Sequence, residues 1–299
     1  MTILITRHDK IGDFITALPM AKVLKEQTNH KIVFLVSKVN LTLAKSFDFI
    51  DDVIEYSEDS FTLISRINKV KPDVSISAYI DFNLGFSLFL AKIPIRIAPA
   101  TKIAQIFFNK KLKQRRSEVK KTEWQYNLDL VNQFDNTLQL DFKRPLLNLN
   151  TQRKNLVLFH CGFGGSSDGN LKLEDYISLA NSIKNKVDII FTFGPDDIEA
   201  KQYIMDNCDF AIKDDFKDLI SFTHFIATSK LFVSTSTGPM HLAGLTNTPT
   251  LSFFGSNLFA SSKRWATISD TRYQNNYEIP LNYTNEFYKQ IEQKLQELI

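Results

Sequence analysis

The residue pattern with the most chemical potential lies near residue 235, where an apolar run ends in four consecutive hydroxyl residues. Leu231–Val233 is typical of a buried strand, Ser234–Thr237 supply the hydroxyls, and Gly238 and Pro239 open an apolar helix. Glycine permits close backbone approach to a ligand, and proline is tolerated in the first helical turn. Free N–H groups at the positive end of the helix dipole suit a phosphate or diphosphate. An ordinary capped helix in an α/β core is the alternative.

Asp13 is the candidate for proton transfer. It follows Gly12 at the start of a predicted helix, directly after the first predicted strand. The helix dipole stabilises a carboxylate at this position. Such a carboxylate is a competent general base if a hydroxyl comes within reach. The simpler alternative is an acidic residue that only stabilises the end of its helix.

Two other turns at predicted strand ends could contact a nucleotide. His160–Ser167 is a Gly/Ser loop that can cradle phosphates through backbone N–H groups. It lacks the Walker lysine spacing and the GxGxxG pattern, so a flexible loop is its alternative. In the turn Phe193–Glu199 an acid could hold a ribose, and a helix cap by Asp196 or Asp197 is the alternative.

Positive charge is concentrated in one stretch. Residues 102–121 hold eight Lys/Arg and one acid, Glu118, although the net charge of the chain is only +3. The run Lys110–Arg116 could meet a phosphorylated lipid or a nucleic acid. Aromatic residues are not interleaved with it, which disfavours single-stranded nucleic acid. A solvated face or loop is the alternative, and the one-sided charge favours an anionic partner.

Composition narrows the class of protein. A chain of 299 residues allows two domains, and 43% hydrophobic with 23% charged residues is typical of a soluble globular protein. Two cysteines form no disulfide framework and no metal-ligand spacing, which indicates a reducing cytoplasm. The first residues begin a strand without the regions of a signal peptide. The apolar runs are far shorter than the ~20 residues of a membrane span.

Strands alternate with helices along the whole chain, which predicts crossover units and mostly parallel sheets. The polar stretch Asp141–Lys154 is the predicted linker, and the last predicted helix is Asn285–Leu298. We therefore predict an α/β protein with two Rossmann-like domains facing a cleft. Their ligands should bind at the carboxyl ends of the strands. The predicted divisions are residues 1–145, residues 146–282, and a closing helix within residues 283–299.

Two separate stretches resemble one family. Ile3–Pro19, with its Arg7, Ile11-Gly12-Asp13 and Leu18-Pro19, resembles the start of ADP-heptose:lipopolysaccharide heptosyltransferases, glycosyltransferase family 9. Ser236–Ala243, followed by Pro249 and Phe254-Gly255, resembles the nucleotide-binding signature of that family. The order and spacing of these motifs match over nearly the whole chain.

The resemblance implies a GT-B fold, with acceptor bound by the first domain, sugar nucleotide by the second, and the last helix crossing back to the first domain. It implies an inverting transfer without metal or cofactor, in which Asp13 is the base and ADP the leaving group. The predicted donor-binding residues are Gly162, Gly164, Ser166, Asp196, Ser236, Thr237, Gly238 and His241. The predicted acceptor-binding residues are Arg7, Lys10, Lys110, Lys113, Arg115 and Arg116.

Two departures from the family pattern concern the donor. Family members usually carry Asp at the position of Ser236, and Lys or Arg followed by Trp where this chain has Gly169-Asn170-Leu171. Lys172, or Lys263 and Arg264, could supply the missing positive charge. The donor is accordingly ADP-heptose or a different nucleotide sugar.

The sequence thus predicts a cytoplasmic heptosyltransferase-like enzyme that is peripheral at the inner membrane and builds lipopolysaccharide or a related surface glycan. Its acceptor would be a phosphorylated, lipid-linked saccharide, which gives the basic stretch a purpose at the membrane surface. No nucleic-acid partner is expected. A nucleotide-sugar epimerase of the same fold and a catalytically silent sugar-nucleotide-binding protein are the rivals, and the retention of Asp13 speaks against the second.

Overall fold

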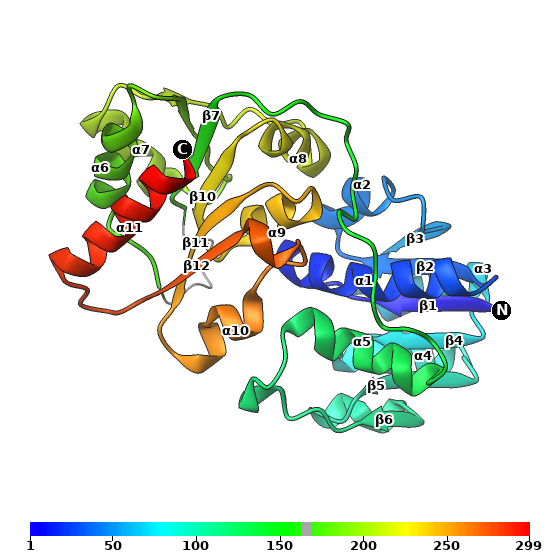
Figure 1. The fold of residues 1–299 in the computed structure, drawn as a ribbon. Coiled ribbons are helices and arrows are strands. Elements are labelled where there is room, and N and C mark those ends of the chain that lie inside the picture. Colours follow the sequence, from blue (N-terminus) through cyan, green and yellow to red (C-terminus); the bar gives the residue numbers. More distant parts are fainter. Residues whose placement is uncertain (163–168) are drawn as a thin grey trace. The chain divides into compact units, whose positions relative to one another are not determined.

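The computed structural model describes residues 1–162 and 169–299, which form two compact units, Met1–Lys143 and Arg144–Ile299 (Figure 1). This division lies two residues from the predicted one. Each unit contains one six-stranded sheet in which all the described strand pairs are parallel. Parallel neighbours need long crossover connections, which explains the regular alternation of strands with helices in the sequence.

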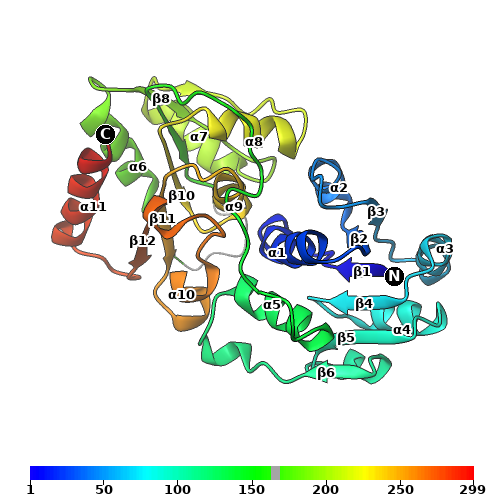
Figure 2. The same ribbon diagram turned by 45° about the vertical axis from the view of Figure 1, so that its right-hand side comes forward.

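The first unit has the strand order β3-β2-β1-β4-β5-β6 (Figure 2). Its elements are β1 (Thr2–Thr6), α1 (Ile11–Gln27), β2 (Lys31–Val36), α2 (Leu41–Ala44), β3 (Asp52–Glu55), α3 (Ser60–Val70), β4 (Val74–Ser77), α4 (Phe82–Leu90), β5 (Ile95–Pro99), the 3₁₀ helix η2 (Ile103–Phe107), β6 (Lys110–Leu112) and α5 (Glu123–Phe134). The strand order changes direction between β1 and β4. Ligands of such sheets bind beyond the carboxyl ends of the strands at this point.

The second unit repeats the plan with the order β12-β11-β10-β7-β8-β9. Its elements are β7 (Leu156–His160), α6 (Leu173–Ile183), β8 (Asp188–Phe191), α7 (Ile198–Asn207), β9 (Ala211–Ile212), α8 (Leu219–Ala227), β10 (Leu231–Thr235), α9 (Gly238–Leu245), β11 (Thr250–Gly255), α10 (Ser262–Trp265), β12 (Gln274–Ile279) and α11 (Asn285–Leu298). Here the order changes direction between β7 and β10. The residues that follow these two strands are therefore the counterparts of those that follow β1 and β4.

The closing helix α11 differs from the prediction. We expected it to cross back to the first domain. Instead Tyr288, Ile291 and Leu295 are buried in the core of the second unit, together with Tyr176 and Ile183 of α6. The apolar stripe of α11 finds its partner in its own unit, because α6 offers an apolar face there.

The predicted linker belongs to the second unit over most of its length. The Leu147 N–H donates to the Leu245 carbonyl at 3.0 Å, and the Lys154 N–H donates to the Thr228 carbonyl at 2.7 Å. The division therefore lies at the start of the predicted linker, not in its middle.

Four strands were not predicted from the sequence, namely β5, β6, β9 and β12. The last three lie at sheet edges, where strands carry polar residues that discourage pairing with other chains. Lys110 and Lys111 in β6, and Asn275 and Asn276 in β12, hide the apolar alternation by which a strand is found. None of the helices in the described ranges combines the length and apolarity that crossing a membrane requires.

Candidate functional site

Arg7 is the centre of a buried charge network at the carboxyl end of β1. Its side chain is 4% exposed, and its Nε donates to Asp9 at 2.8 Å. Of its terminal nitrogens, one donates to Asp13 in the first turn of α1, and the other donates to the carbonyl of Ala78 at 3.2 Å. Since Ala78 follows β4, the guanidinium links the ends of the two strands between which the strand order changes direction.

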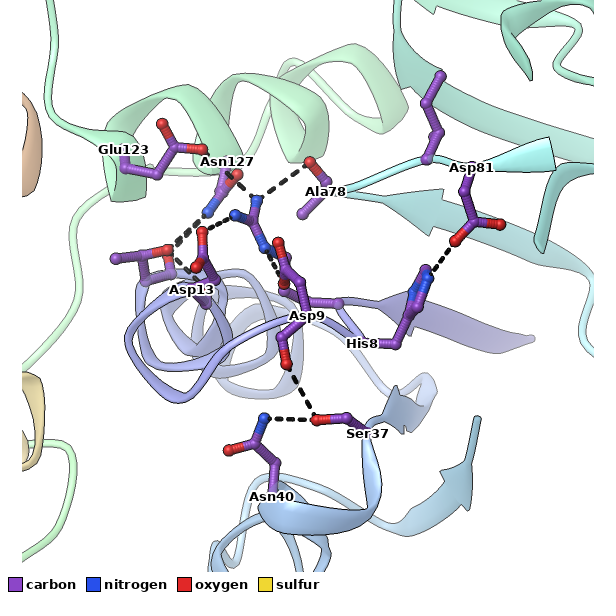
Figure 3. A network of polar contacts seen from close by, with 12 residues as sticks. His8, Asp9, Asp13, Ser37, Asn40, Ala78, Asp81, Glu123 and Asn127 are labelled. Carbon is purple, nitrogen blue, oxygen red and sulfur yellow. Dashed lines mark hydrogen bonds and ion pairs between the residues drawn. The ribbon is translucent and has the colours of Figure 1, made fainter. Parts of the chain in front are cut away.

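A second helix adds another carboxylate to this network. Glu123, in the first turn of α5, is 2% exposed, and Arg7 Nη1 donates to it at 3.4 Å. Arg116 pairs with the same carboxylate. The helix begins here because the Gln125 side chain accepts a hydrogen bond from the Thr122 N–H at 2.9 Å, half of a capping box. The carboxylates of Asp9, Asp13 and Glu123 thus gather at one place (Figure 3), where Arg7 contacts all three. Arg116 joins them through Glu123.

The electrostatics of the network follow from burial and charge. Burial alone would lower the pKa of Arg7, but the carboxylates of Asp9, Asp13 and Glu123 outweigh it and raise that pKa. Burial raises the pKa of Asp9, against the attraction of Arg7 and with the added repulsion of Asp13. Arg7 is therefore permanently charged, while the carboxylates around it include one with an increased affinity for a proton.

The loop between β1 and α1 is fixed by contacts with neighbouring strands. Ser37, after β2, donates from Oγ to the Asp9 carbonyl at 3.0 Å. His8 Nε2 lies 2.5 Å from the carboxylate of Asp81, which follows β4 (Figure 3). The pKa of Asp81 is lowered, because hydrogen bonds from His8 and the Leu84 N–H outweigh the effect of burial. The backbone before Asp13 is accordingly held from both sides.

This geometry corrects the role predicted for Arg7. We expected it to contact the acceptor, but its polar atoms are engaged by carboxylates and by Ala78. The side chain of Asp13 keeps 18% exposure against 4% for Arg7. Arg7 therefore orients Asp13, whose carboxylate stays partly accessible.

The predicted acceptor residues do not form one cluster. Arg116 is 17% exposed and bonded to Glu123, so it belongs to the buried network. Lys10, Lys110, Lys113 and Arg115 are exposed, and Arg115 pairs with Glu118 at 3.1 Å. Their contact with an acceptor stays a prediction.

The second unit presents a different kind of strand end after β10. The Ser236 N–H donates to the Phe253 carbonyl at 2.7 Å, and Thr235 Oγ1 donates to the Gly169 carbonyl at 3.1 Å. Thr237 is the N-cap of α9. Within the described residues its side chain accepts no hydrogen bond from the first N–H groups of the helix. The first N–H groups of a helix have no partner within it. This end of α9, with Gly238 at its first position, can therefore accept an anion.

Gly169 shows why a glycine is needed beside this turn. A Cβ added there would lie 2.4 Å from the Phe254 carbonyl oxygen and 2.5 Å from the Gly255 Cα. The backbone at Gly169 is thus pressed against the end of β11. Any side chain would push this segment away from the strand ends.

An acid of the turn after β8 is buried, and it is not the predicted one. Asp197 accepts from the Gly194 N–H at 2.7 Å and lies 3.5 Å from His160 Nε2, whereas Asp196 is exposed. A Cβ on Gly162 would meet the Asp197 carboxylate at 2.1 Å. Burial lowers the pKa of His160, against the attraction of Asp197. Asp197 therefore connects the ends of β7 and β8 through His160 and Gly194. The contact of Asp196 with a ribose stays a prediction.

The other predicted donor residues divide into two groups. Thr237 and His241 are buried at the start of α9, and Ser236 and Gly238 are half-buried. Gly164 and Ser166 lie outside the described residues. The structure thus brings together four of the predicted residues around one helix end.

The basic residue missing from the family pattern has one buried substitute. Asn170 donates to the Cys161 carbonyl at 3.3 Å and accepts from the Tyr176 hydroxyl at 2.5 Å, so it is a structural link. Arg264 in α10 is 7% exposed, and its guanidinium lies 3.7 Å from the ring centroid of Phe259. Lys172 and Lys263 are exposed. Arg264 is the candidate with a fixed position.

The sequence did not single out Asp9 or Glu123, and Asp197 was expected only as an alternative helix cap. Asp9 stands four residues before Asp13, and its proximity to the same turn was the available signal. Glu123 is far away in the sequence, and nothing in its surroundings indicates that it would meet Arg7. Only the packing of α5 on α1 brings them together.

Solved structures share this fold over the whole chain. E. coli ADP-heptose lps heptosyltransferase II matches with a TM-score of 0.81 at 15% identity, covering 100% of this chain and 98% of that one. E. coli heptosyltransferase WaaC with ADP-2-deoxy-2-fluoro heptose matches with a TM-score of 0.75 at 16% identity, covering all of both chains. Two Rossmann-like units of this kind define the GT-B fold, so the predicted fold is confirmed.

The family follows from sequence comparison. A model described as glycosyltransferase family 9 (heptosyltransferase) matches residues 88–295. A Haemophilus influenzae protein named "Putative glycosyltransferase" is 34% identical over 90% of this chain and 86% of its own length. The chain belongs to glycosyltransferase family 9 and is a glycosyltransferase, as its motifs predicted.

Proposed function

We propose that the protein transfers a sugar from a nucleotide diphosphate donor, ADP-heptose in the first instance, to a lipopolysaccharide core or related surface-glycan acceptor. The observation that carries this proposal is the Asp13 carboxylate held by Arg7 at the end of β1. The resemblance to heptosyltransferases supports the choice of donor. One structural neighbour, E. coli heptosyltransferase WaaC, was solved with ADP-2-deoxy-2-fluoro heptose, which supports it too.

In the proposed reaction Asp13 removes the proton of an acceptor hydroxyl. The oxygen attacks the anomeric carbon from the side opposite to the leaving group, the bond to the diphosphate breaks, and ADP departs with its electron pair. The configuration at the anomeric carbon is inverted. Arg7 acts on this step only by fixing the orientation of Asp13.

Charge on the departing diphosphate must be stabilised without a metal. The N-terminal N–H groups of α9 and its dipole would do this, with Thr237, Gly238 and His241 along the diphosphate. Arg264 would supply the positive charge that the family usually places after the glycine loop. These groups all follow β10 or β11 in one unit.

The acceptor would be a phosphorylated, lipid-linked saccharide at the cytoplasmic face of the inner membrane. The exposed residues Lys10, Lys110, Lys113 and Arg115 support this assignment, because a basic surface attracts both phosphate groups and anionic lipids. No nucleic acid takes part.

An assay with donor alone separates this proposal from its two rivals. A transferase releases ADP quickly only when acceptor is added, an epimerase converts the donor sugar without acceptor, and a silent binding protein does neither. We expect acceptor-dependent release of ADP that persists in excess chelator. Epimerised donor without acceptor, or loss of transfer after chelation, would contradict the proposal.

The identity of the donor is tested by thermal shift. A ligand that binds the native state raises the unfolding midpoint in proportion to the logarithm of its concentration over Kd. Among nucleotide diphosphate sugars, those with ADP should raise the midpoint most. A larger shift with UDP or GDP sugars would keep the reaction class and replace the donor.

A further inference from the structure

An exposed apolar surface covers the outer side of α4 and η2 in the first unit. We call it the α4/η2 patch and define it by its most exposed side chains. They are Phe82, Phe89 and Leu90 of α4, at 60%, 49% and 44% exposure, and Ile103 and Ile106 of η2, at 81% and 66%. Soluble proteins rarely expose so many large apolar side chains together, and such patches mark interaction sites.

The patch is anchored firmly in the fold. The Phe107 ring lies 5.1 Å from the Phe82 ring and 6.1 Å from the Phe89 ring, so η2 and α4 form one aromatic surface. A Cβ on Gly85 would meet the Phe107 ring at 2.9 Å, which shows how closely the two helices pack. On the inner side Leu84 is fully buried in the core. The outer side chains are thus presented on a rigid support.

The segment that builds the patch carries cationic side chains and no acidic ones. The 36 residues from Phe82 to Ser117 contain eight Lys/Arg and no Asp or Glu. Asp81, just before α4, is already bonded to His8 and to the Leu84 N–H.

Of the cations in this segment, Arg96 lies 5.5 Å from the ring centroid of Phe89, Lys92 follows α4, and Lys102 directly precedes η2. Arg115 and Arg116 pair instead with Glu118 and Glu123.

The register of the edge strand places one lysine on the side of the patch. Lys111 of β6 pairs with Ala98 of β5, and Ala98 is buried in the same core cluster as Leu84. Paired residues of neighbouring strands point to the same side of a sheet, and successive residues point to opposite sides. Lys111 therefore lies on the side of α4 and η2, and Lys110 on the other side.

We propose that the α4/η2 patch is the surface with which this protein docks on an anionic lipid bilayer. Apolar side chains on a helical surface would enter the boundary between headgroups and acyl chains, while Lys111 and its basic neighbours meet the anionic headgroups. This inference deepens the proposed membrane location and rests on it. The combination of aromatic and aliphatic side chains with adjacent cations is typical of surfaces that enter an anionic membrane interface, and a protein partner is left as an outcome of the test.

Sedimentation with vesicles tests the docking surface. The native protein should bind vesicles of phosphatidylcholine and phosphatidylglycerol, bind pure phosphatidylcholine weakly, and lose affinity as salt rises. The double variant Ile103→Ser/Ile106→Ser should bind about tenfold more weakly or worse, because burial of each aliphatic side chain contributes on that scale. Leu281→Ser, at an 87% exposed position in the second unit, is the matched control and should bind like the native protein.

Two further variants separate a bilayer from a protein partner. Ile106→Trp should retain or strengthen vesicle binding, since tryptophan favours the membrane interface, whereas a shaped protein groove would not accept the larger ring. Lys111→Glu should weaken binding to the anionic vesicles about fivefold or more, and Lys110→Glu should weaken it less. Circular dichroism melts would check that each variant is folded.

The outcomes are distinguishable. If the native protein binds anionic vesicles and the Ile103→Ser/Ile106→Ser variant binds equally well, the patch is not the docking surface. If the native protein binds no vesicles and the same variant changes a dimer into a monomer, a second copy covers the patch and the inference is wrong. Transfer to a water-soluble acceptor analogue would measure the proposed glycosyl transfer independently of both results.

Discussion

The helices α4 and α9 occupy equivalent places in their two units, after β4 and after β10, but their N-terminal ends differ. In α4 the Asp81 carboxylate accepts from the Leu84 N–H at 2.7 Å, so the chain fills the positive end of the helix with its own negative charge. In α9, within the described residues, the N-cap Thr237 makes no such side-chain bond. One helix end is capped by a carboxylate of the chain, and the other has no side-chain cap among the described residues, so we propose it as the anion site.

The strand ends beside these helices differ in the same sense. Around Arg7 the first unit gathers the carboxylates of Asp9, Asp13 and Glu123. The second unit offers hydroxyls, glycines and backbone N–H groups at the same level of its sheet. The comparison teaches that one architecture can carry a buried charge network at the strand ends of one unit and hydroxyls with backbone N–H groups at those of the other, which is the division of roles that we propose.

Removing Arg7 should have the largest effect on stability. Arg7→Ala leaves Asp9, Asp13 and Glu123 without their shared partner, and loss of one member of a buried ion pair costs about 3–5 kcal/mol. Denaturant unfolding should show this decrease in the free energy of unfolding. Arg115→Ala, which breaks an exposed pair with Glu118, should lower the free energy of unfolding far less. Equal free energies of unfolding for the two variants would show that the buried network stabilises the fold no more than an exposed ion pair does.

Thr237→Asp should make the open helix end resemble the closed one. The new carboxylate would compete with the diphosphate for the first N–H groups of α9 and repel it, so donor affinity should fall about a hundredfold. Thr237→Asn has similar size without the charge and should lose far less. Calorimetric titration with ADP measures both. Unchanged affinity in the aspartate variant would place the diphosphate elsewhere.

Substitution of Arg264 tests whether this residue supplies the positive charge for the diphosphate in the second unit. Arg264→Gln should weaken ADP binding about tenfold, as expected for loss of one charge-assisted hydrogen bond. Lys263→Gln changes the exposed neighbour in the same short helix and should have little effect. If the two variants lose the same affinity, a fixed arginine is not required.

His160 should give the second unit a pH dependence of its own. Burial lowers the pKa of His160 in the folded state. Below about pH 6.5 its imidazole therefore binds a proton in the unfolded chain but stays neutral in the folded chain. Stability should therefore decrease as pH falls from about 6.5 to 5, by up to about 1.4 kcal/mol per pH unit from this residue. His160→Gln should flatten that part of the curve of unfolding free energy against pH. His224→Gln, at an exposed position, should leave it unchanged.

The sequence was sufficient wherever a residue's role depends on its neighbours in the chain. Buried strands such as Lys31–Val36, and the turn from β10 to α9, are local patterns, and the structure contains both. The role of Arg7 was not predictable, because Glu123 and Ala78 reach it only through the packing of α5 and β4. The choice between Asp196 and Asp197 depended on which side chain faces Gly162, and this is a property of the folded turn.

The closing helix was predicted with the bounds that it has, but its packing partner and the edge strands were not predicted, for another reason. Their side chains satisfy local patterns that fit several tertiary arrangements. The apolar stripe of α11 could have covered either unit, and only the complementary face of α6 decides between them.

The central claim is that Asp13 takes the proton of the acceptor, and the turnover of Asp13→Asn tests it most directly. Asp9→Asn is the matched control, because both carboxylates bind Arg7 and have similar exposure, 18% for Asp13 and 21% for Asp9. We predict that Asp13→Asn lowers turnover by about 10²–10⁴, the usual contribution of general-base catalysis, while ADP binds as in the native protein. Asp9→Asn should retain most of its turnover. A folded Asp13→Asn variant with near-native turnover, or a greater loss in Asp9→Asn, would contradict the account.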